Sequence, residues 1–290
     1  MSRVVILGDV MLDVVVRQLA PLAPTSDTPS SIRVGRGGSA ASVAIAVARD
    51  AHRVRFIGAA GSDDAARIVR SALEDGGVEA RFQIVDASTG TVVSMVNEDG
   101  QRAMLTDRGA NSRLSAEFVL ESLGEAFDHL HVSGYLFLDD ATRSIARAAL
   151  EHARMKGRSV SVDVCSVAPL LGITSEVFLE AAAGATHLFA NEEEALALAA
   201  RTSLESAVEV LSERFDEVVI TRGPRGALVA RGTERREVAA QSVHVLDTTG
   251  AGDAATGAYL GARLNAQGMT AALGSAMAAA ARVVGDLGAS

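Results

Sequence analysis

The segment 247–255 contains the residues whose types and spacing are best suited to chemistry. Gly250 and Gly252 flank Ala251 and allow a sharp turn, so that successive backbone N–H groups can face one point. A helix of small residues is expected to follow over 254–264, and the positive end of its dipole favours an anion at that point. Asp253 adds a carboxylate there, which could accept a proton from an attacking hydroxyl group. The alternative is an aspartate that only caps the helix.

Lysine usage narrows the ways in which this chain can bind phosphate. Lys156 is its only lysine and lies at the expected charged end of a helix, just before Gly157. A P-loop lysine, a Schiff-base lysine and a protein-kinase lysine are therefore not expected. Phosphate binding must use backbone N–H groups, arginines or a metal ion.

Composition indicates an ordinary enzyme with a small-molecule substrate. The chain has 290 residues, a net charge of −9, no tryptophan and two tyrosines, which argues against nucleic acid or an anionic membrane as partner. Cys165 is the only cysteine, and residues 1–9 show no signal peptide, so we expect a reducing, cytoplasmic location. The uncharged stretch 264–281 contains polar residues and is interpreted as buried helix rather than as a membrane span.

Strand-like and helix-like segments alternate along most of the chain. The expected strands are 3–7, 54–57, 130–132, 159–162, 187–190 and 217–221. The expected helices are 39–49, 63–75, 141–155, 175–183, 192–200 and 204–214. This alternation predicts an α/β fold, with a mostly parallel sheet covered by helices on both faces and ligands beyond the carboxyl ends of the strands. No linker divides the chain, so a single domain over 1–290 is expected.

Two stretches interrupt the alternation and predict a small antiparallel β lid. The first contains strand candidates 12–17 and 31–34, and the second contains 81–85, 91–97 and 102–106, joined by short turns such as 98–101. The lid segments are therefore expected at about 12–34 and 81–107. Their exposed edges would favour pairing of two subunits into a homodimer.

Five motifs in order give the chain a family resemblance. Residues 247–257 closely resemble the C-terminal signature of the ribokinase-like (PfkB-type) carbohydrate kinases, and 37–44 is similar to their glycine pair and following helix. Segments 8–13, 191–194 and 221–226 match further elements of that family. The resemblance implies a three-layer sandwich with a β lid, and a kinase that uses ATP and Mg²⁺.

The resemblance places the sugar near the base of the lid. It implies that Asp13 holds sugar hydroxyl groups, as a carboxylate that accepts hydroxyl protons can do. Gly37 and Gly38 would let the sugar approach the backbone closely, although a plain strand-to-helix turn is the alternative. Ser42 stands where the family usually has an asparagine, which weakens the sugar contact expected there.

The nucleotide site is expected at the carboxyl edge of two later strands. The resemblance implies that Asn191 and Glu194 help to position Mg²⁺ and the ATP phosphates, Glu194 through water. Thr221, Gly223 and Gly226 would line the ATP site. The alternative for the glycines is an ordinary turn.

A monovalent cation is also implied beside the anion site. In the ribokinase branch, the equivalents of Asp247 and Thr249 belong to a loop that binds K⁺, and oxygen ligands suit such a cation. The competing interpretation is that both residues satisfy backbone groups in the turn.

These inferences favour ATP-dependent phosphorylation of a primary hydroxyl group on a small sugar, with Asp253 as general base and the N–H groups of 251–253 as anion hole. Residues 108–111 are closer to ribokinase-type than to adenosine-kinase-type chains, which favours a ribose-like pentose or a ketohexose. A nucleoside kinase of the same fold is the alternative. More distant alternatives are a non-catalytic sugar-binding regulator and an NAD-dependent oxidoreductase, the latter suggested by the glycine spacing of 35–40.

Overall fold

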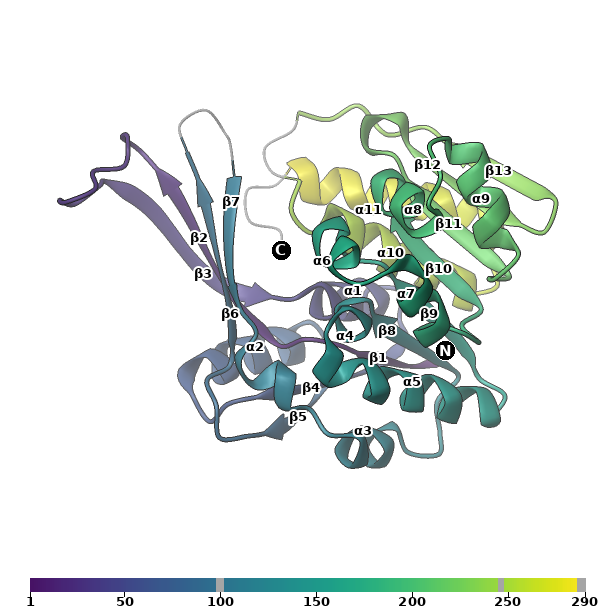
Figure 1. The fold of residues 1–290 in the computed structure, drawn as a ribbon, viewed down its shortest axis with the longest axis horizontal. Helices are drawn as coiled ribbons and strands as arrows, with labels where there is room; N and C mark the ends of the chain where they lie inside the picture. Colours follow the sequence, from purple (N-terminus) through teal and green to yellow (C-terminus); the bar gives the residue numbers. More distant parts are fainter. Residues whose placement is uncertain (98–101, 245–247, 286–290) are drawn as a thin grey trace.

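The computed structural model describes residues 1–97, 102–244 and 248–285. A nine-stranded sheet with helices on both faces forms the body of the molecule, and a separate four-stranded sheet projects from it (Figure 1). The predicted α/β fold with a β lid is confirmed.

The large sheet is mostly parallel. Its parallel strands are β1 (Arg3–Leu7), β4 (Arg53–Ala60), β5 (Val78–Ile84), β8 (His129–Ser133), β9 (Ser159–Asp163), β10 (His187–Asn191) and β11 (Glu217–Thr221). Strands β12 (Ala227–Arg231) and β13 (Glu234–Val238) continue one edge in antiparallel pairing. The strand order is β13-β12-β11-β10-β9-β8-β1-β4-β5. Because the parallel strands share one direction, their carboxyl ends meet at one edge of the sheet.

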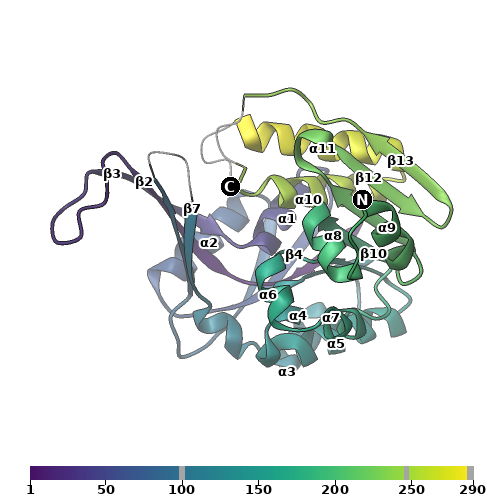
Figure 2. The ribbon, with the colours of Figure 1, turned by 45° about the horizontal axis from the view of Figure 1, so that its top comes forward.

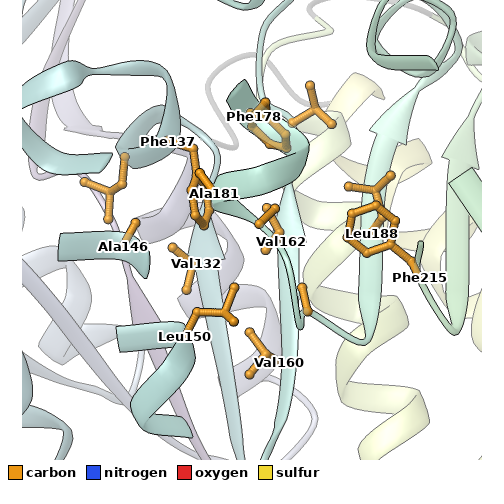
Figure 3. Packing of buried hydrophobic residues seen from close by; sticks show 14 of the residues in the cluster. Val132, Phe137, Ala146, Leu150, Val160, Val162, Phe178, Ala181, Leu188 and Phe215 are labelled. Carbon is orange, nitrogen blue, oxygen red and sulfur yellow. The ribbon is translucent and has the colours of Figure 1, made fainter. Parts of the chain in front are cut away.

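Strand side chains alternate between two hydrophobic cores, one on each face of the sheet. In β1, Val5 and Leu7 enter the first core, whereas Val4 and Ile6 enter the second. The first core, part of which is drawn in Figure 3, is covered by α3 (Ala116–Leu123), α4 (Tyr135–Leu138), α5 (Asp140–Met155), α6 (Val167–Gly172), α7 (Ser175–Ala181), α8 (Glu192–Ala199) and α9 (Leu204–Ser212). The second is covered by α1 (Ser39–Ala48), α2 (Asp64–Asp75), α10 (Ala251–Leu264) and α11 (Met269–Gly285). These layers explain why the strands are apolar on both faces.

Helices α1 and α10 approach each other closely because their contact surfaces are built from small residues. A side chain at Gly257 would overlap Ala46 and place its Cβ 2.8 Å from the Val43 carbonyl oxygen. The two helices begin at the same edge of the sheet, so this packing brings their first turns together.

The lid consists of β2 (Met11–Gln18), β3 (Ser30–Gly37), β6 (Gly90–Val96) and β7 (Arg102–Asp107), in the order β3-β2-β6-β7. The pairs β2–β3 and β6–β7 are antiparallel, and the central pair β2–β6 is parallel. Figures 1 and 2 show this sheet standing away from the body. Strand β3 leads directly into α1, and β7 leads into the 3-10 helix η1 (Gly109–Arg113). The lid is therefore continuous with elements that line the site described below.

One expected lid strand belongs to the body. Residues 81–85 were expected to pair with the lid ribbon, but β5 contains residues 81–84 and pairs in parallel with β4 at the edge of the large sheet. Helix α2 supplies the crossover that a parallel pair requires. Val78, Ala80 and Phe82 are buried on the core face of β5, and this burial determines which sheet the strand joins.

The structure also contains elements that were not expected, among them α3, β12 and β13, and some element ends differ. Helix α10 begins at Ala251, three residues before the expected start, because Gly250 already provides its N-cap. Residues 264–281 span the end of α10, a turn and most of α11, rather than one continuous helix. Among the described residues, none of the helices has both the length and the apolar character that a membrane span requires. The turn at 98–101 lies outside the described residues.

Candidate active site

A cavity of about 970 Å³ lies where the lid meets the carboxyl edge of the large sheet. It is lined from the lid side by β2, β3, β6 and β7, from the sheet side by the ends of β9, β10 and β11, and from below by the first turns of α1 and α10. This location agrees with the expectation that ligands bind beyond the carboxyl ends of parallel strands.

Most of the residues proposed from the sequence line this cavity. They are Asp13, Gly37, Gly38, Ser42, Asn191, Glu194, Thr221, Thr249, Gly250, Gly252 and Asp253. Ala251, Gly223 and Gly226 are not among the lining residues. Asp247 lies outside the described residues. Segments far apart in the sequence therefore line one cavity.

Asp253 is held by a hydroxyl group from another helix. Ser39, the first residue of α1, donates a hydrogen bond from Oγ to Asp253 Oδ1 at 2.6 Å. Burial raises the pKa of Asp253, while the Ser39 hydrogen bond and the positive charge of Arg36 lower it. The Ser39 hydroxyl thus orients the carboxylate in the first turn of α10, and a general base requires such a fixed orientation.

The start of α10 provides backbone donors beside that carboxylate. Gly250 is the N-cap, with a φ of 74° that favours glycine. The first intrahelical bond runs from the Ala254 N–H to the Gly250 carbonyl oxygen at 2.9 Å. The N–H groups of Gly252 and Asp253 precede that bond and so have no acceptor within the helix. They are positioned for an anion in the cavity.

Two details of this turn differ from the sequence expectation. The Ala251 N–H donates to the Thr248 carbonyl oxygen at 3.3 Å, so it is engaged in the turn rather than directed at an anion. Gly252 does not have a positive φ, and a side chain there would meet nothing within 4 Å. The positive φ of this turn is therefore at Gly250, and Gly252 lines the cavity without a close neighbour at its Cα.

Gly38 makes the corresponding turn before α1. Its φ is 95°, and a Cβ there would lie 2.7 Å from the Asp9 carbonyl oxygen. The strand-to-helix turn thus requires glycine at this position, whatever the substrate. Gly37 is close to Asp13, since a Cβ at 37 would lie 3.0 Å from the Asp13 Cβ.

Two arginines missed by sequence reasoning line the same part of the cavity. Arg36 is only 8% exposed and donates from Nη1 to Ser42 Oγ at 2.9 Å. Arg108 contacts Asp9 through both terminal nitrogens, at 2.9 and 3.2 Å, and its Nε lies 2.8 Å from Asp139 Oδ2. The only sequence signal for either was an arginine next to a motif glycine, in 35–38 and in 108–111.

Asn191 and Glu194 cap α8 by a reciprocal pair of hydrogen bonds. The Glu194 N–H donates to Asn191 Oδ1, and the Asn191 N–H donates to Glu194 Oε2, both at 2.8 Å. The pair therefore has a structural role in addition to facing the cavity. Gly223 and Gly226 have positive φ angles and form the turn between β11 and β12, where a side chain at 226 would overlap the Val238 carbonyl oxygen. The turn requires these glycines, and their contribution to an ATP site stays a prediction.

The cavity-lining carboxylate of Asp163, at the end of β9, was also missed. It accepts hydrogen bonds from the Cys165 N–H at 3.1 Å and from Thr256 Oγ1 at 3.2 Å. Burial and the nearby charges of Glu194 and Asp253 raise its pKa well above the usual value. Within the described part of the chain, no three His, Cys, Asp or Glu side chains are arranged to hold a metal ion. The oxygen-rich cavity fits a Mg²⁺ ion bound mainly by water and nucleotide phosphates.

Comparison with known proteins agrees with this geometry. The chain matches the pfkB family carbohydrate kinase over residues 1–290. It is 33% identical over 296 residues to the ATP-dependent ribose-1-phosphate kinase of Halopiger xanaduensis, covering 100% of this chain and 94% of that protein. It is 30% identical to a fructokinase of Vibrio alginolyticus, covering 90% of this chain and 83% of that protein.

Solved structures give the same result. The ribokinase of Thermotoga maritima superimposes with a TM-score of 0.83 and 26% identity, over 100% of this chain and 95% of that one. The adenosine kinase of Sinorhizobium meliloti has a TM-score of 0.88 at 24% identity, over 99% of this chain and 94% of that one, which supports the fold. The chain therefore belongs to the pfkB family of carbohydrate kinases and is a phosphotransferase that acts on a sugar hydroxyl group.

Proposed function

We propose that the protein transfers the γ-phosphoryl group of ATP to a primary hydroxyl group of a small sugar, with a ribose-like pentose or a ketohexose as the favoured acceptor. The single observation that carries this proposal is the position of Asp253. Its carboxylate accepts a hydrogen bond from Ser39 where the first turn of α10 lines the cavity.

In the proposed reaction, Asp253 accepts the proton of the sugar hydroxyl as its oxygen attacks the γ-phosphorus. The N–H groups of Gly252 and Asp253 would stabilise the negative charge on the transferring phosphoryl group. Bound Mg²⁺ would neutralise charge on the ATP phosphates, and Asn191 and Glu194 are the residues proposed to position it, Glu194 through water. The lid would exclude water from the site, which limits ATP hydrolysis.

The sugar and nucleotide are assigned to opposite ends of the cavity. Asp13, Gly37, Gly38 and Ser42 form the proposed sugar end, next to the lid. Thr221, with Gly223 and Gly226 behind it, belongs to the proposed ATP end. Thr249, together with Asp247, is proposed to bind K⁺, and a homodimer through the lid and a cytoplasmic location also stay predictions.

A nucleoside kinase is the second candidate. The aminoimidazole riboside kinase of Salmonella typhimurium is 28% identical to this chain, over 90% of this chain and 80% of that protein. Both candidates share the phosphoryl-transfer chemistry and differ in what occupies the sugar end.

The test is ADP release from Mg·ATP with a panel of sugars and nucleosides, and with no acceptor as control. We expect acceptor-dependent ADP release with at least one sugar. Acceptor-independent or absent ADP release would contradict the proposal, and a sugar-dependent absorbance change with a nicotinamide cofactor would support an oxidoreductase instead.

A further inference from the structure

Arg36 is a buried cation at the sugar end of the cavity. It lies near the end of β3, one residue before the glycine pair, and is 8% exposed. Among the residues that the structure describes, its hydrogen-bond partner is the neutral Ser42 hydroxyl, at 2.9 Å, and no carboxylate oxygen lies within 4 Å of its guanidinium nitrogens. Arg108 differs, because Asp9 and Asp139 both pair with it.

A buried guanidinium group without a paired anion is unfavourable. Arginine keeps its charge in proteins, so loss of water has to be compensated by hydrogen bonds or by an opposite charge. Burial lowers the pKa of Arg36, and the positive charge of Arg49 acts in the same direction. The charges of Asp253 and Asp13 oppose this effect from beyond ion-pair distance. One hydrogen bond to Ser42 uses one of the five N–H donors of the group. Acceptors for the other N–H donors can bind in the cavity that Arg36 lines.

The residue at position 42 decides which hydrogen-bonding groups the sugar end of the cavity offers. The Ser42 hydroxyl accepts the bond from Arg36 and lies 3.3 Å from the Gly38 carbonyl oxygen, to which it donates. An asparagine, which the resemblance leads us to expect at 42, would offer both a donor and an acceptor. Arg36 offers donors only, in a fork that matches the oxygens of a phosphate or a carboxylate.

We propose that Arg36 binds an anionic group of the acceptor sugar, so that the protein phosphorylates a sugar phosphate or a sugar acid in preference to a neutral sugar. This inference rests on the proposed function and specifies the substrate class of the same site. The anion occupies the space beside Arg36 and forms the ion pair that no carboxylate of the described residues forms there. Arg36 is thereby a specificity-determining residue.

The test compares matched acceptors in wild type, Arg36→Met and Arg36→Lys. Methionine retains an apolar stem without the charge, and lysine retains the charge without the planar fork. Arg147→Met is the control, because Arg147 is exposed, does not line the cavity and is not among the charges that act on Arg36. The acceptors are ribose 1-phosphate, ribose and gluconate, which separate phosphate from carboxylate recognition with a neutral reference.

We expect wild type to favour one of the two anionic acceptors over ribose. In Arg36→Met, the ratio of kcat/KM for the anionic acceptor to that for ribose should fall by about 10- to 100-fold, the usual effect of losing a charged hydrogen-bond partner. The fall should lie mainly in KM for the sugar, with KM for ATP unchanged. Arg36→Lys should retain part of the preference, and Arg147→Met should retain all of it.

A wild-type preference for ribose would overturn the inference. So would an Arg36→Met variant that raises KM for ATP equally with every acceptor, because Arg36 would then serve the nucleotide phosphates. Thermal unfolding with ribose 1-phosphate, gluconate or ribose gives a readout that does not depend on turnover. An anionic ligand should raise the Tm of wild type more than that of Arg36→Met. Equal Tm shifts in the two proteins would overturn the inference, whether or not any acceptor is phosphorylated. Failure to phosphorylate any acceptor would contradict the proposed function but not the anion site.

Discussion

Replacing Ser39 with alanine removes the hydroxyl group that donates to the proposed general base. Ser39 Oγ lies 2.6 Å from Asp253 Oδ1, within the range of charge-assisted O–H···O⁻ hydrogen bonds. A bond of this kind favours the charged acceptor by about 1.5–3 kcal/mol. Burial raises the pKa of Asp253, and the Ser39 bond opposes that effect, so loss of the hydroxyl should raise the pKa further.

The sign of the effect on activity follows from the role of the base. Asp253 must be ionised to accept a proton. A higher pKa of Asp253 therefore shifts the acid limb of the pH–activity profile to higher pH. At a pH where Asp253 is mostly protonated in both proteins, kcat/KM of Ser39→Ala should be about 10- to 100-fold below wild type, the ratio that corresponds to the energy of the lost bond. The two profiles should converge at alkaline pH, where both carboxylates are ionised.

The assay is the pH profile of kcat/KM for the acceptor, measured by ADP release. Ser39→Thr is the matched control, because it keeps a hydroxyl group and should keep the wild-type acid limb. Thermal unfolding of both variants checks that α1 and α10 remain packed. A uniform loss of activity at all pH values, or an acid limb identical to wild type, would refute the reasoning that links Ser39 to the ionisation of Asp253.

The remaining predictions concern the sugar end, the anion hole, the cation and stability. Asp13→Ala should raise KM for the sugar by about tenfold or more in steady-state kinetics, because it removes a charged acceptor of hydroxyl hydrogen bonds; an unchanged KM would exclude it from the sugar end. Gly252→Val should lower kcat while sugar binding by calorimetry persists, since the new side chain enters the space assigned to the phosphates; loss of sugar binding in a folded variant would contradict this division of the site. Turnover should rise when K⁺ is added, and equal activity in a bulky organic cation would remove Thr249 from the proposed cation loop. Burial would raise the pKa of Glu217, but hydrogen bonds from Arg263 and Tyr259 outweigh it and lower the pKa. That stabilisation is present above the pKa of Glu217 in the unfolded chain and is lost as the pH falls through its pKa in the folded protein. Glu217→Gln should therefore lower the Tm at neutral pH, with a smaller difference from wild type in acid. Equal Tm values at neutral pH would contradict this prediction.

The central motif could be predicted because its geometry is local. Gly250, Gly252 and Asp253 lie within four residues of one another, and a glycine-rich turn before a helix has few conformations. The βα alternation likewise predicted the parallel sheet, since each strand and helix carries its own periodicity. The strand β5 was misassigned because its apolar alternation fits either sheet, and only packing against α2 and the second core decides between them.

Two of the residues whose contacts sequence reasoning missed, Ser39 and Arg108, act through contacts between distant segments. Ser39 and Asp253 are 214 positions apart, and Arg108 and Asp9 are 99 positions apart. Their contacts depend on how closely α1 approaches α10 and on where the lid joins the body. No local pattern encodes those distances, so a serine at a helix start and an arginine beside a glycine carry no signal of their own.

The central claim is that Asp253 is the base of a phosphoryl transfer, and Asp253→Asn tests it most directly. Asparagine keeps the size of the side chain but cannot accept the proton, so kcat should fall by about 10²- to 10⁴-fold while sugar and ATP affinities change little. Asp140→Asn is the control, because Asp140 also lines the cavity but its side chain is 87% exposed. Turnover of Asp253→Asn near that of wild type, in a protein that still binds both substrates, would contradict the account.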